Sequence, residues 1–281
     1  MGINKASKTG HETKTRGNTF LSFTRDLIIT LLLWGYFIFG FILFFSPFYL
    51  IAFVCPPIRE PGIQCLNHLF YKGFFSLVRM LMPGIGWHID PSVKSLENCI
   101  IVGNHVSYLD PLMMIALFRR HKTIVKSTFF KVPVFGWVLR AAGYIPSMPK
   151  GRLSSLMVRQ TTALASFLEK GGILFVFPEG TRNRNAGKGV LEFHTGVFKM
   201  ARFCRSPINA VKIRNTDKLF TPGRFLFHTG FSGVISVELA GTIQPDYDNE
   251  TVSAAGLMEQ AKTILSEKQR RSPWDYHTDK P

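Results

Sequence analysis

The chain has 281 residues, with 34 Lys and Arg against 18 Asp and Glu, and its formal net charge is +16. This length suffices for one domain with a sizeable core plus an appendage, and the charge implies a polyanionic partner: nucleic acid, an anionic lipid surface or a phosphorylated small molecule. Four cysteines without a CxxC pair disfavour a disulfide framework and a structural zinc site. Residues 119 to 218 hold 19 of the basic residues against four acidic ones, so the surplus is concentrated there.

An uncharged apolar run of 32 residues lies between Asp26 and Arg59. A bilayer span requires about 20 such residues. The run is too long and too aromatic for a secretory signal, and no small-residue cleavage pattern follows it. We therefore predict a basic N-terminal tail over residues 1–26, followed by a membrane-embedded or interfacial helical anchor over residues 27–87.

The charges on both flanks of this run are mainly basic, which is the signal of the cytoplasmic side of a membrane. A helix that breaks near Pro47, dips into the bilayer and returns places both flanks on that side, and a single span is the alternative. Residues 63–82 then fit an amphipathic helix at the interface. The remainder of the chain is expected on the cytoplasmic face, which in a bacterium is that of the inner membrane.

Short β-branched runs alternate with helical patterns between residues 88 and 250. Strands are predicted at 99–103, 123–126, 173–177, 208–213 and 234–241, and helices at 111–120, 134–142, 154–171 and 196–204. This alternation predicts an α/β domain with a mostly parallel sheet flanked by helices and with its functional groups at the carboxyl ends of the strands. Residues 251–281 are predicted to form a C-terminal helix and a polar tail.

The stretch NHVSYLD, residues 104–110, places His105 and Asp110 directly after the first of these strands. On one continuous helix the two side chains would lie roughly 140° apart, on different faces. Asp110 precedes Pro111, however, a pattern typical of an N-cap and the first helical position. The helix start can then hold the carboxylate against one imidazole nitrogen and leave the other free as a general base. The alternative is a capping aspartate beside an ordinary loop histidine.

A second loop, FPEGTR at residues 177–182, follows another predicted strand. Gly180 permits a positive φ and a close approach of the backbone to a ligand. Arg182 offers a planar fork that suits phosphate oxygens. A loop of this composition by itself is a weak signal.

The two motifs together resemble the glycerolipid acyltransferase family, whose best-known members are the 1-acylglycerol-3-phosphate (lysophosphatidate) acyltransferases. The resemblance covers roughly residues 97–245 and implies the glycerol-3-phosphate acyltransferase-like fold for residues 88–250. It further implies that His105 takes the proton from the free hydroxyl of a lysolipid, which attacks the thioester of acyl-CoA or acyl carrier protein. Asp110 then orients the histidine, and no covalent acyl-enzyme is expected.

The same resemblance implies which residues bind substrate: Asn104, Lys126, Glu179, Gly180, Thr181 and Arg182. The implied partners are a lysolipid acceptor, acyl-CoA or acyl carrier protein, and an anionic membrane, all of which suit the basic surplus. Lysophosphatidate is the expected acceptor and phosphatidic acid the product.

Departures from the family pattern leave the acceptor open. The second motif usually runs into an arginine, but here it reads GYIPSMPKGR at residues 143–152, so that Lys150 or Arg152 is left to supply the charge. Thr128 stands where many members carry Glu, and Ala210 where a proline is usual. Another lysophospholipid, or a lyso-aminolipid such as lyso-ornithine lipid, is therefore an alternative acceptor.

Other classes of function fit less well. The sequence has no HExxH motif, no histidine pair at ligand spacing and no phosphate loop, so we expect no metal and no cofactor beyond the acyl donor. Nucleic-acid binding is disfavoured because no recognition helix or aromatic ribonucleoprotein motif is present. A non-catalytic membrane protein that binds anionic lipid remains an alternative, although it would need neither His105 with Asp110 nor Glu179 with Arg182.

Overall fold

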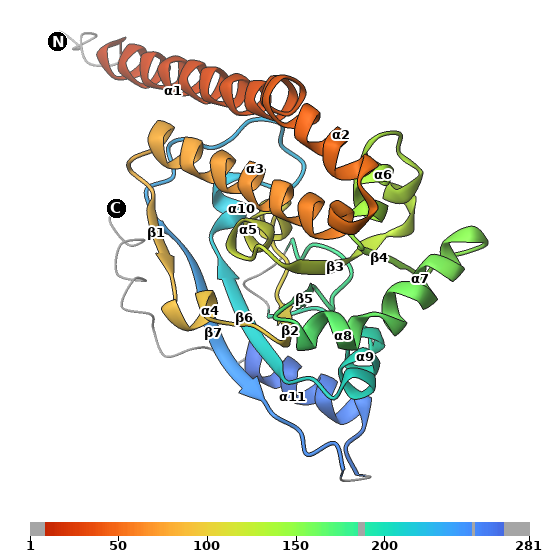
Figure 1. Cartoon of the computed structure of the whole chain (residues 1–281). Helices are drawn as coiled ribbons and strands as arrows, with labels where there is room; N and C mark the ends of the chain where they lie inside the picture. Colours follow the sequence, from red (N-terminus) through yellow and green to blue (C-terminus); the bar gives the residue numbers. More distant parts are fainter. Residues whose placement is uncertain (1–8, 185–188, 249–250, 267–281) are drawn as a thin grey trace, which may run out of the picture.

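The computed structural model describes residues 9–184, 189–248 and 251–266. An α/β domain lies beside a long helical arm built from the N-terminal residues (Figure 1). The first eight residues of the expected basic tail, and the expected polar tail from residue 267, lie outside the described residues.

The centre of the domain is one sheet with the strand order β1-β7-β6-β2-β5-β3-β4. Its strands are β1 Gly86–Ile89, β2 Cys99–Gly103, β3 His121–Lys126, β4 Ile145–Ser147, β5 Ile173–Val176, β6 Ile208–Arg214 and β7 Val234–Ile243. β6 and β7 pair antiparallel and every other pair is parallel, which confirms the predicted mostly parallel α/β fold. The sheet begins at Gly86, two residues before the expected domain boundary.

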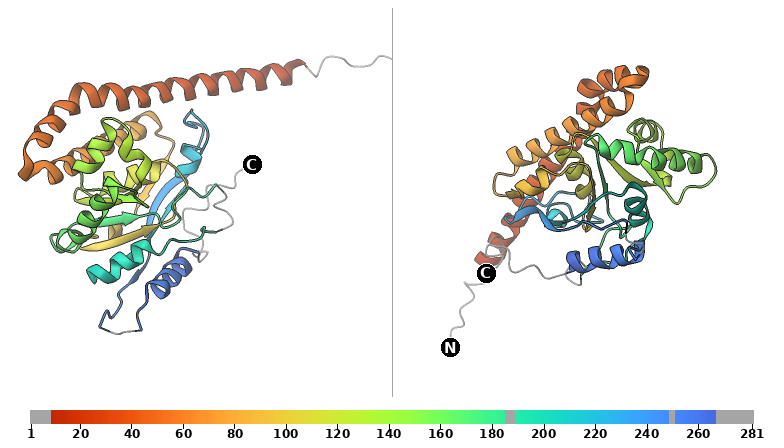
Figure 2. Two further views of the ribbon diagram at one scale, coloured as in Figure 1. Left: turned by 90° about the vertical axis from the view of Figure 1, so that its right-hand side faces the viewer. Right: turned by 60° about the horizontal axis from the view of Figure 1, so that its bottom comes forward.

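Helices cover both faces of the sheet (Figure 2). Ile100 and Val102 of β2 pack with α8, α9 and α11 on one face, while Ile101 packs with α3 and α5 on the other. All of β2 is buried, because alternate side chains of a covered parallel strand both enter a core. The helices of the domain are α4 Pro91–Lys94, α5 Leu109–Leu117, α6 Phe135–Ala141, α7 Arg152–Thr162, α8 Leu164–Glu169, α9 Gly196–Cys204, α10 Thr216–Leu219 and α11 Ala254–Ser266.

The N-terminal arm consists of α1 Thr9–Gly35, a π-helical stretch Tyr36–Phe45 and α2 Ser46–Val54. We expected the helix to break near Pro47, and this position is wrong. Pro47 lies in the first turn of α2, and the helix continues through it. The chain reverses only after Val54, at the 3₁₀ turn Pro56–Ile58, and returns as α3 Arg59–Leu81. Within the described residues, the stretch Phe20–Val54 is the one helix long and apolar enough to cross a membrane.

The arm is held on the domain by residues 220–231, the loop between α10 and β7. The backbone N–H of Phe227 donates to Thr30 Oγ1 at 2.9 Å, and that of Thr229 donates to Asp26 Oδ1 at 3.0 Å. The ring of Trp34 stacks on Phe225 at 5.7 Å between centroids. Polar contacts therefore fix the rotation of α1 about its own axis.

A buried chain of hydrogen bonds also joins the arm to the sheet. Tyr49 of α2 donates to Asn67 Oδ1 at 2.6 Å, and the Asn67 amide donates to the Tyr144 hydroxyl at 3.3 Å. Tyr144 in turn lies 2.6 Å from His121 Nε2, while His121 Nδ1 lies 2.7 Å from the Phe118 carbonyl. Since a carbonyl only accepts, Nδ1 carries a proton. Burial disfavours a second proton on this fully buried imidazole, so it is neutral and Nε2 accepts from Tyr144.

This histidine predicts a loss of stability in acid. Burial lowers the pKa of His121 to about 4, whereas in the unfolded chain it titrates near 6.5. The unfolded state therefore binds a proton first as the pH falls below 6.5, and the folded state loses about 2 kcal/mol between pH 7 and pH 5. We expect His121→Phe to remove that part of the pH dependence, measured by urea unfolding in detergent. An unchanged slope would contradict a neutral buried imidazole.

Candidate active site

Three of the parallel strands end at the same edge of the sheet, and each delivers polar side chains there. His105 follows β2, the loop with Glu179 and Arg182 follows β5, and Thr216 follows β6. The carboxyl ends of neighbouring parallel strands are where α/β proteins bind ligands.

Asp110 forms the centre of this cluster. Its side chain is fully buried, and Oδ2 accepts from the backbone N–H groups of Val106 at 2.7 Å and Ser107 at 2.8 Å. Thr216 donates to Oδ1 at 2.5 Å. The expectation that Asp110 is an N-cap is wrong, because α5 begins one residue earlier and Asp110 lies in its first turn. The carboxylate instead closes the preceding loop onto the helix.

His105 packs against this carboxylate, with Nδ1 at 2.9 Å from Asp110 Oδ2 and 17% of the side chain exposed. Its ring stacks on Phe177 at 4.6 Å between centroids. A carboxylate only accepts, so Nδ1 carries a proton, and in the neutral imidazole Nε2 is the nitrogen with the free lone pair. In the described part of the chain, Nε2 has no hydrogen-bond partner. The arrangement is that of an oriented general base.

Glu179 joins the two motif loops. The side chain is buried, and its two oxygens accept from the backbone N–H groups of His105 and Leu191, each at 2.9 Å. Burial raises the pKa of this carboxyl, and the two backbone hydrogen bonds lower it in part. Both oxygens are thus occupied by the protein itself, and Glu179 positions the loop that carries His105.

Arg182 lies three residues after Glu179 on this loop. Its Cζ lies 3.4 Å from the centroid of the Tyr108 ring, and Nη1 is buried without a hydrogen-bond partner among the described residues. A buried guanidinium N–H without an acceptor is costly, and a phosphate oxygen would satisfy it. Gly180 has φ +62°, and a Cβ there would come within 2.9 Å of His194. Thr181 beside it is exposed.

The structure places two other expected site residues differently. Asn104 is buried, donates to the Ile213 carbonyl at 2.9 Å and accepts from the Ile213 N–H at 2.7 Å, so its amide clamps β2 to β6. Lys126 is exposed at the end of β3, two strands away from β2. Their assignment to substrate binding stays a prediction. Thr216 was not predicted, although its place after a predicted strand was the available signal.

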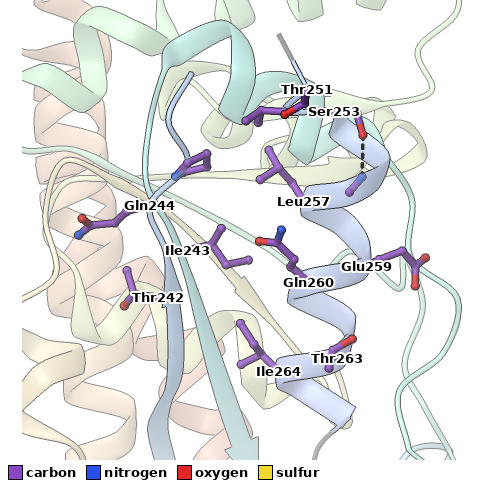
Figure 3. Close-up of a pocket in the computed structure, with 13 residues that line it drawn as sticks. Thr242, Ile243, Gln244, Thr251, Ser253, Leu257, Glu259, Gln260, Thr263 and Ile264 are labelled. Atoms are coloured by element: carbon purple, nitrogen blue, oxygen red, sulfur yellow. Dashed lines mark hydrogen bonds between the residues drawn. The ribbon is translucent and has the colours of Figure 1, made fainter. Parts of the chain in front are cut away.

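A cavity of about 770 Å³ lies elsewhere, between the end of β7 and α11 (Figure 3). Ile243, at the end of β7, pairs with Ile208, at the start of β6, so this cavity is at the opposite edge of the sheet from His105. Among the described residues, Glu259 is the one charged residue that lines it. The described lining contains no histidine and no cation.

The fold and the site together define an α/β protein with a carboxylate-oriented histidine and an arginine on neighbouring strand ends. The family model for acyltransferases matches residues 84–214. The matched segment runs from just before β1 to the end of β6.

Several relatives share the name 1-acyl-sn-glycerol-3-phosphate acyltransferase. The chloroplastic protein of Brassica napus is 29% identical over 47% of this chain and 39% of its own length. The Borreliella burgdorferi protein is 31% identical over 52% of this chain and 57% of its own length. The Saccharomyces cerevisiae protein is 28% identical over 75% of this chain and 66% of its own length. This chain thus spans less than two thirds of each of these relatives.

A solved structure supports the fold. The 1-acyl-sn-glycerophosphate acyltransferase PlsC from Thermotoga maritima aligns with a TM-score of 0.65, covering 87% of this chain and 95% of that one. At 22% sequence identity, this likeness shows the shared fold alone.

Glu179 provides a test of the site geometry. Glu179→Gln places an amide where a backbone N–H now finds an acceptor, so one of the two hydrogen bonds is lost, at a cost of about 1–3 kcal/mol. We expect the amide of His105 or Leu191 to exchange about 10- to 100-fold faster, measured by hydrogen–deuterium exchange. Glu192→Gln is the matched control, since Glu192 is exposed and pairs with Lys262. Equal exchange in both variants would contradict the bridging role.

Proposed function

We propose that this protein transfers an acyl chain from acyl-CoA or acyl carrier protein to the free hydroxyl of a lysolipid. The acceptor is 1-acyl-sn-glycerol-3-phosphate and the product phosphatidic acid. The observation that carries the proposal is the 2.9 Å contact between His105 Nδ1 and the buried Asp110 carboxylate, which leaves Nε2 of a partly exposed ring as the nitrogen that is free to take a proton.

The chemistry follows from that geometry. Nε2 of His105 takes the proton of the acceptor hydroxyl while its oxygen attacks the thioester carbonyl. The new C–O bond forms, the C–S bond breaks, and the departing thiolate takes the proton back from the imidazolium. Asp110 stabilises the imidazolium between these steps, because its charge lies against Nδ1.

The side chain of Arg182 supports lysophosphatidate as the acceptor. Its buried Nη1 lacks an acceptor within the described residues, and a phosphate monoester presents oxygens that fit the guanidinium fork. The names of the relatives support the same acceptor. A lyso-ornithine lipid has no phosphate oxygen to offer this nitrogen.

The apolar helix supports a membrane location. Only 22% of its most apolar stretch is buried inside the protein, and side chains such as Phe39, Leu43 and Leu50 are mainly exposed. In water this surface would be an unusually large apolar patch, and lipid acyl chains would cover it. The proposed location is a membrane, with the α/β domain on its cytoplasmic face, where acyl-CoA and acyl carrier protein are found.

The first test is acyl transfer by the detergent-purified protein and its His105→Ala variant. We offer labelled palmitoyl-CoA or palmitoyl carrier protein with lysophosphatidate and a panel of other lysolipids. Loss of the general base should lower the rate of acyl transfer at least about 100-fold. The His228→Ala variant, which changes an exposed histidine, is the control and should keep the full rate. If only another lysolipid gives product, that lysolipid is the acceptor and lysophosphatidate is not. No product from any pair, with the protein folded, would favour the lipid-binding alternative.

Thr216 is proposed as a positioning residue. Thr216→Val removes the hydrogen bond to Asp110 Oδ1 and leaves the carboxylate free to turn away from His105. A loss of about 1–2 kcal/mol lowers kcat roughly 10-fold with an unchanged KM for the acceptor, and Thr216→Ser restores kcat. A parallel change in KM, or a failure of serine to rescue, would show that Thr216 supports only the fold.

A further inference from the structure

We propose that the α/β domain carries a second membrane-docking surface, separate from the apolar helix, which binds an anionic lipid leaflet. It is formed by the segment from β3 to α6 and by the residues between β4 and α7. We call it the α6–α7 surface. The inference rests on the proposed membrane location and identifies which part of the domain meets the lipid.

Its apolar part consists of six large side chains that are 41–85% exposed: Phe129, Val132, Val134, Phe135, Trp137 and Met148. Five of them fall within nine consecutive residues. Phe129 and Phe135 contact each other edge to face, at 6.0 Å between centroids, so these rings form one cluster. A soluble domain seldom gathers this many exposed apolar side chains, and such a patch marks an interaction site.

The backbone holds two of these side chains outward at a cost. Val134 has φ +61° and Met148 has φ +43°. A β-branched residue in the left-handed region is a genuine outlier, and such strain persists where it serves a function. Both residues are exposed and apolar, so no burial in the protein compensates for the strain.

Its charged part is a cavity of about 630 Å³ between α6 and α7. Five cations line this cavity: Lys131, Arg140, Lys150, Arg152 and Arg159. No acidic side chain lines it, and no salt bridge joins these cations to an acid among the described residues. The Arg140 guanidinium is held by the carbonyls of Gly136 and Phe130. Like charges around one concave surface create a field that attracts anions.

The surface adjoins the end of the apolar helix. The Gln64 amide of α3 donates to the Ala142 carbonyl at 2.9 Å, which fixes the end of α6 against the start of α3. The exposed Val54 and Ile58 flank the turn just before that start. Figure 1 accordingly shows α6 beside the end of α2. One leaflet can therefore contact both.

The combination of side chains selects the partner. Trp and other apolar side chains that enter the interfacial region, with Lys and Arg at the headgroups, are the composition of a membrane-binding surface. A soluble phosphate compound or an acidic carrier protein would account for the cations but would leave the six apolar side chains in water. We therefore assign the surface to an anionic leaflet.

The test places an environment-sensitive fluorophore on the full chain. Trp137→Cys is labelled with NBD in a background that replaces the accessible cysteines Cys55, Cys65 and Cys204 by Ser. Phe203→Cys, an equally exposed position on α9, is the matched control. In vesicles of phosphatidylcholine with phosphatidylglycerol, we expect a blue-shifted emission and quenching by doxyl lipids at position 137 and neither at position 203.

The charges are tested in the same vesicles. Each cation near an anionic leaflet contributes about fivefold, so Lys150→Gln with Arg152→Gln should lower the ratio of docked to undocked label roughly 25-fold. Lys199→Gln with Arg202→Gln on α9 is the matched control and should have no effect. Vesicles of phosphatidylcholine alone should show little docking of either protein.

A label at position 137 that stays in water, on protein that floats with the vesicles, would overturn the proposal and leave the membrane location intact. Shielding of the label by palmitoyl-CoA or carrier protein without vesicles would also overturn it, because the surface would then be a donor site. Acyl transfer measured on the same labelled protein in detergent reports separately whether the proposed function holds.

Discussion

The structure of the site depends on one buried carboxylate. Asp110 is removed from water completely, and burial of an unsatisfied charge would cost several kcal/mol. Four donors offset this cost: two backbone N–H groups, the hydroxyl of Thr216 and Nδ1 of His105. Because these donors come from the loop after β2 and from the start of α10, the charge can be buried only when both elements are in place. The proposed general base, His105, is therefore positioned by folding itself, before any substrate arrives.

A second polar network fixes the position of the arm relative to the sheet. The chain of donors from Tyr49 to His121 runs through the apolar interior between α2, α3 and the sheet. Each member gives one hydrogen bond to the next, so the network is satisfied only in one relative position of arm and sheet. Apolar side chains of α1, α2 and α3 are buried in one core, while these polar contacts define where the arm sits.

The sequence predicted the strands best where every residue of the strand is buried. The runs at 99–103 and 173–177 are apolar throughout because parallel strands are covered on both faces, and their expected positions agree with β2 and β5. β4 escaped prediction because it has three residues and contains Pro146, and β1 because it is four residues long and only half-buried. The contact of Thr216 with Asp110 spans 106 residues and follows from the register of β6 on β2, which no local pattern contains.

The loop between α10 and β7 has a mechanical consequence. Thr30 of the arm holds Phe227, whose ring stacks on Phe220 at 4.6 Å, and the Phe220 carbonyl accepts from Ser107, the residue whose N–H binds Asp110. A tilt of α1 is thus applied, through consecutive contacts, to the residues beside the imidazole. In the proposed membrane location, the thickness and lateral pressure of the surrounding lipid act on α1 directly. The bilayer would then be a mechanical load on the loop that carries His105, and a detergent micelle would be a different load.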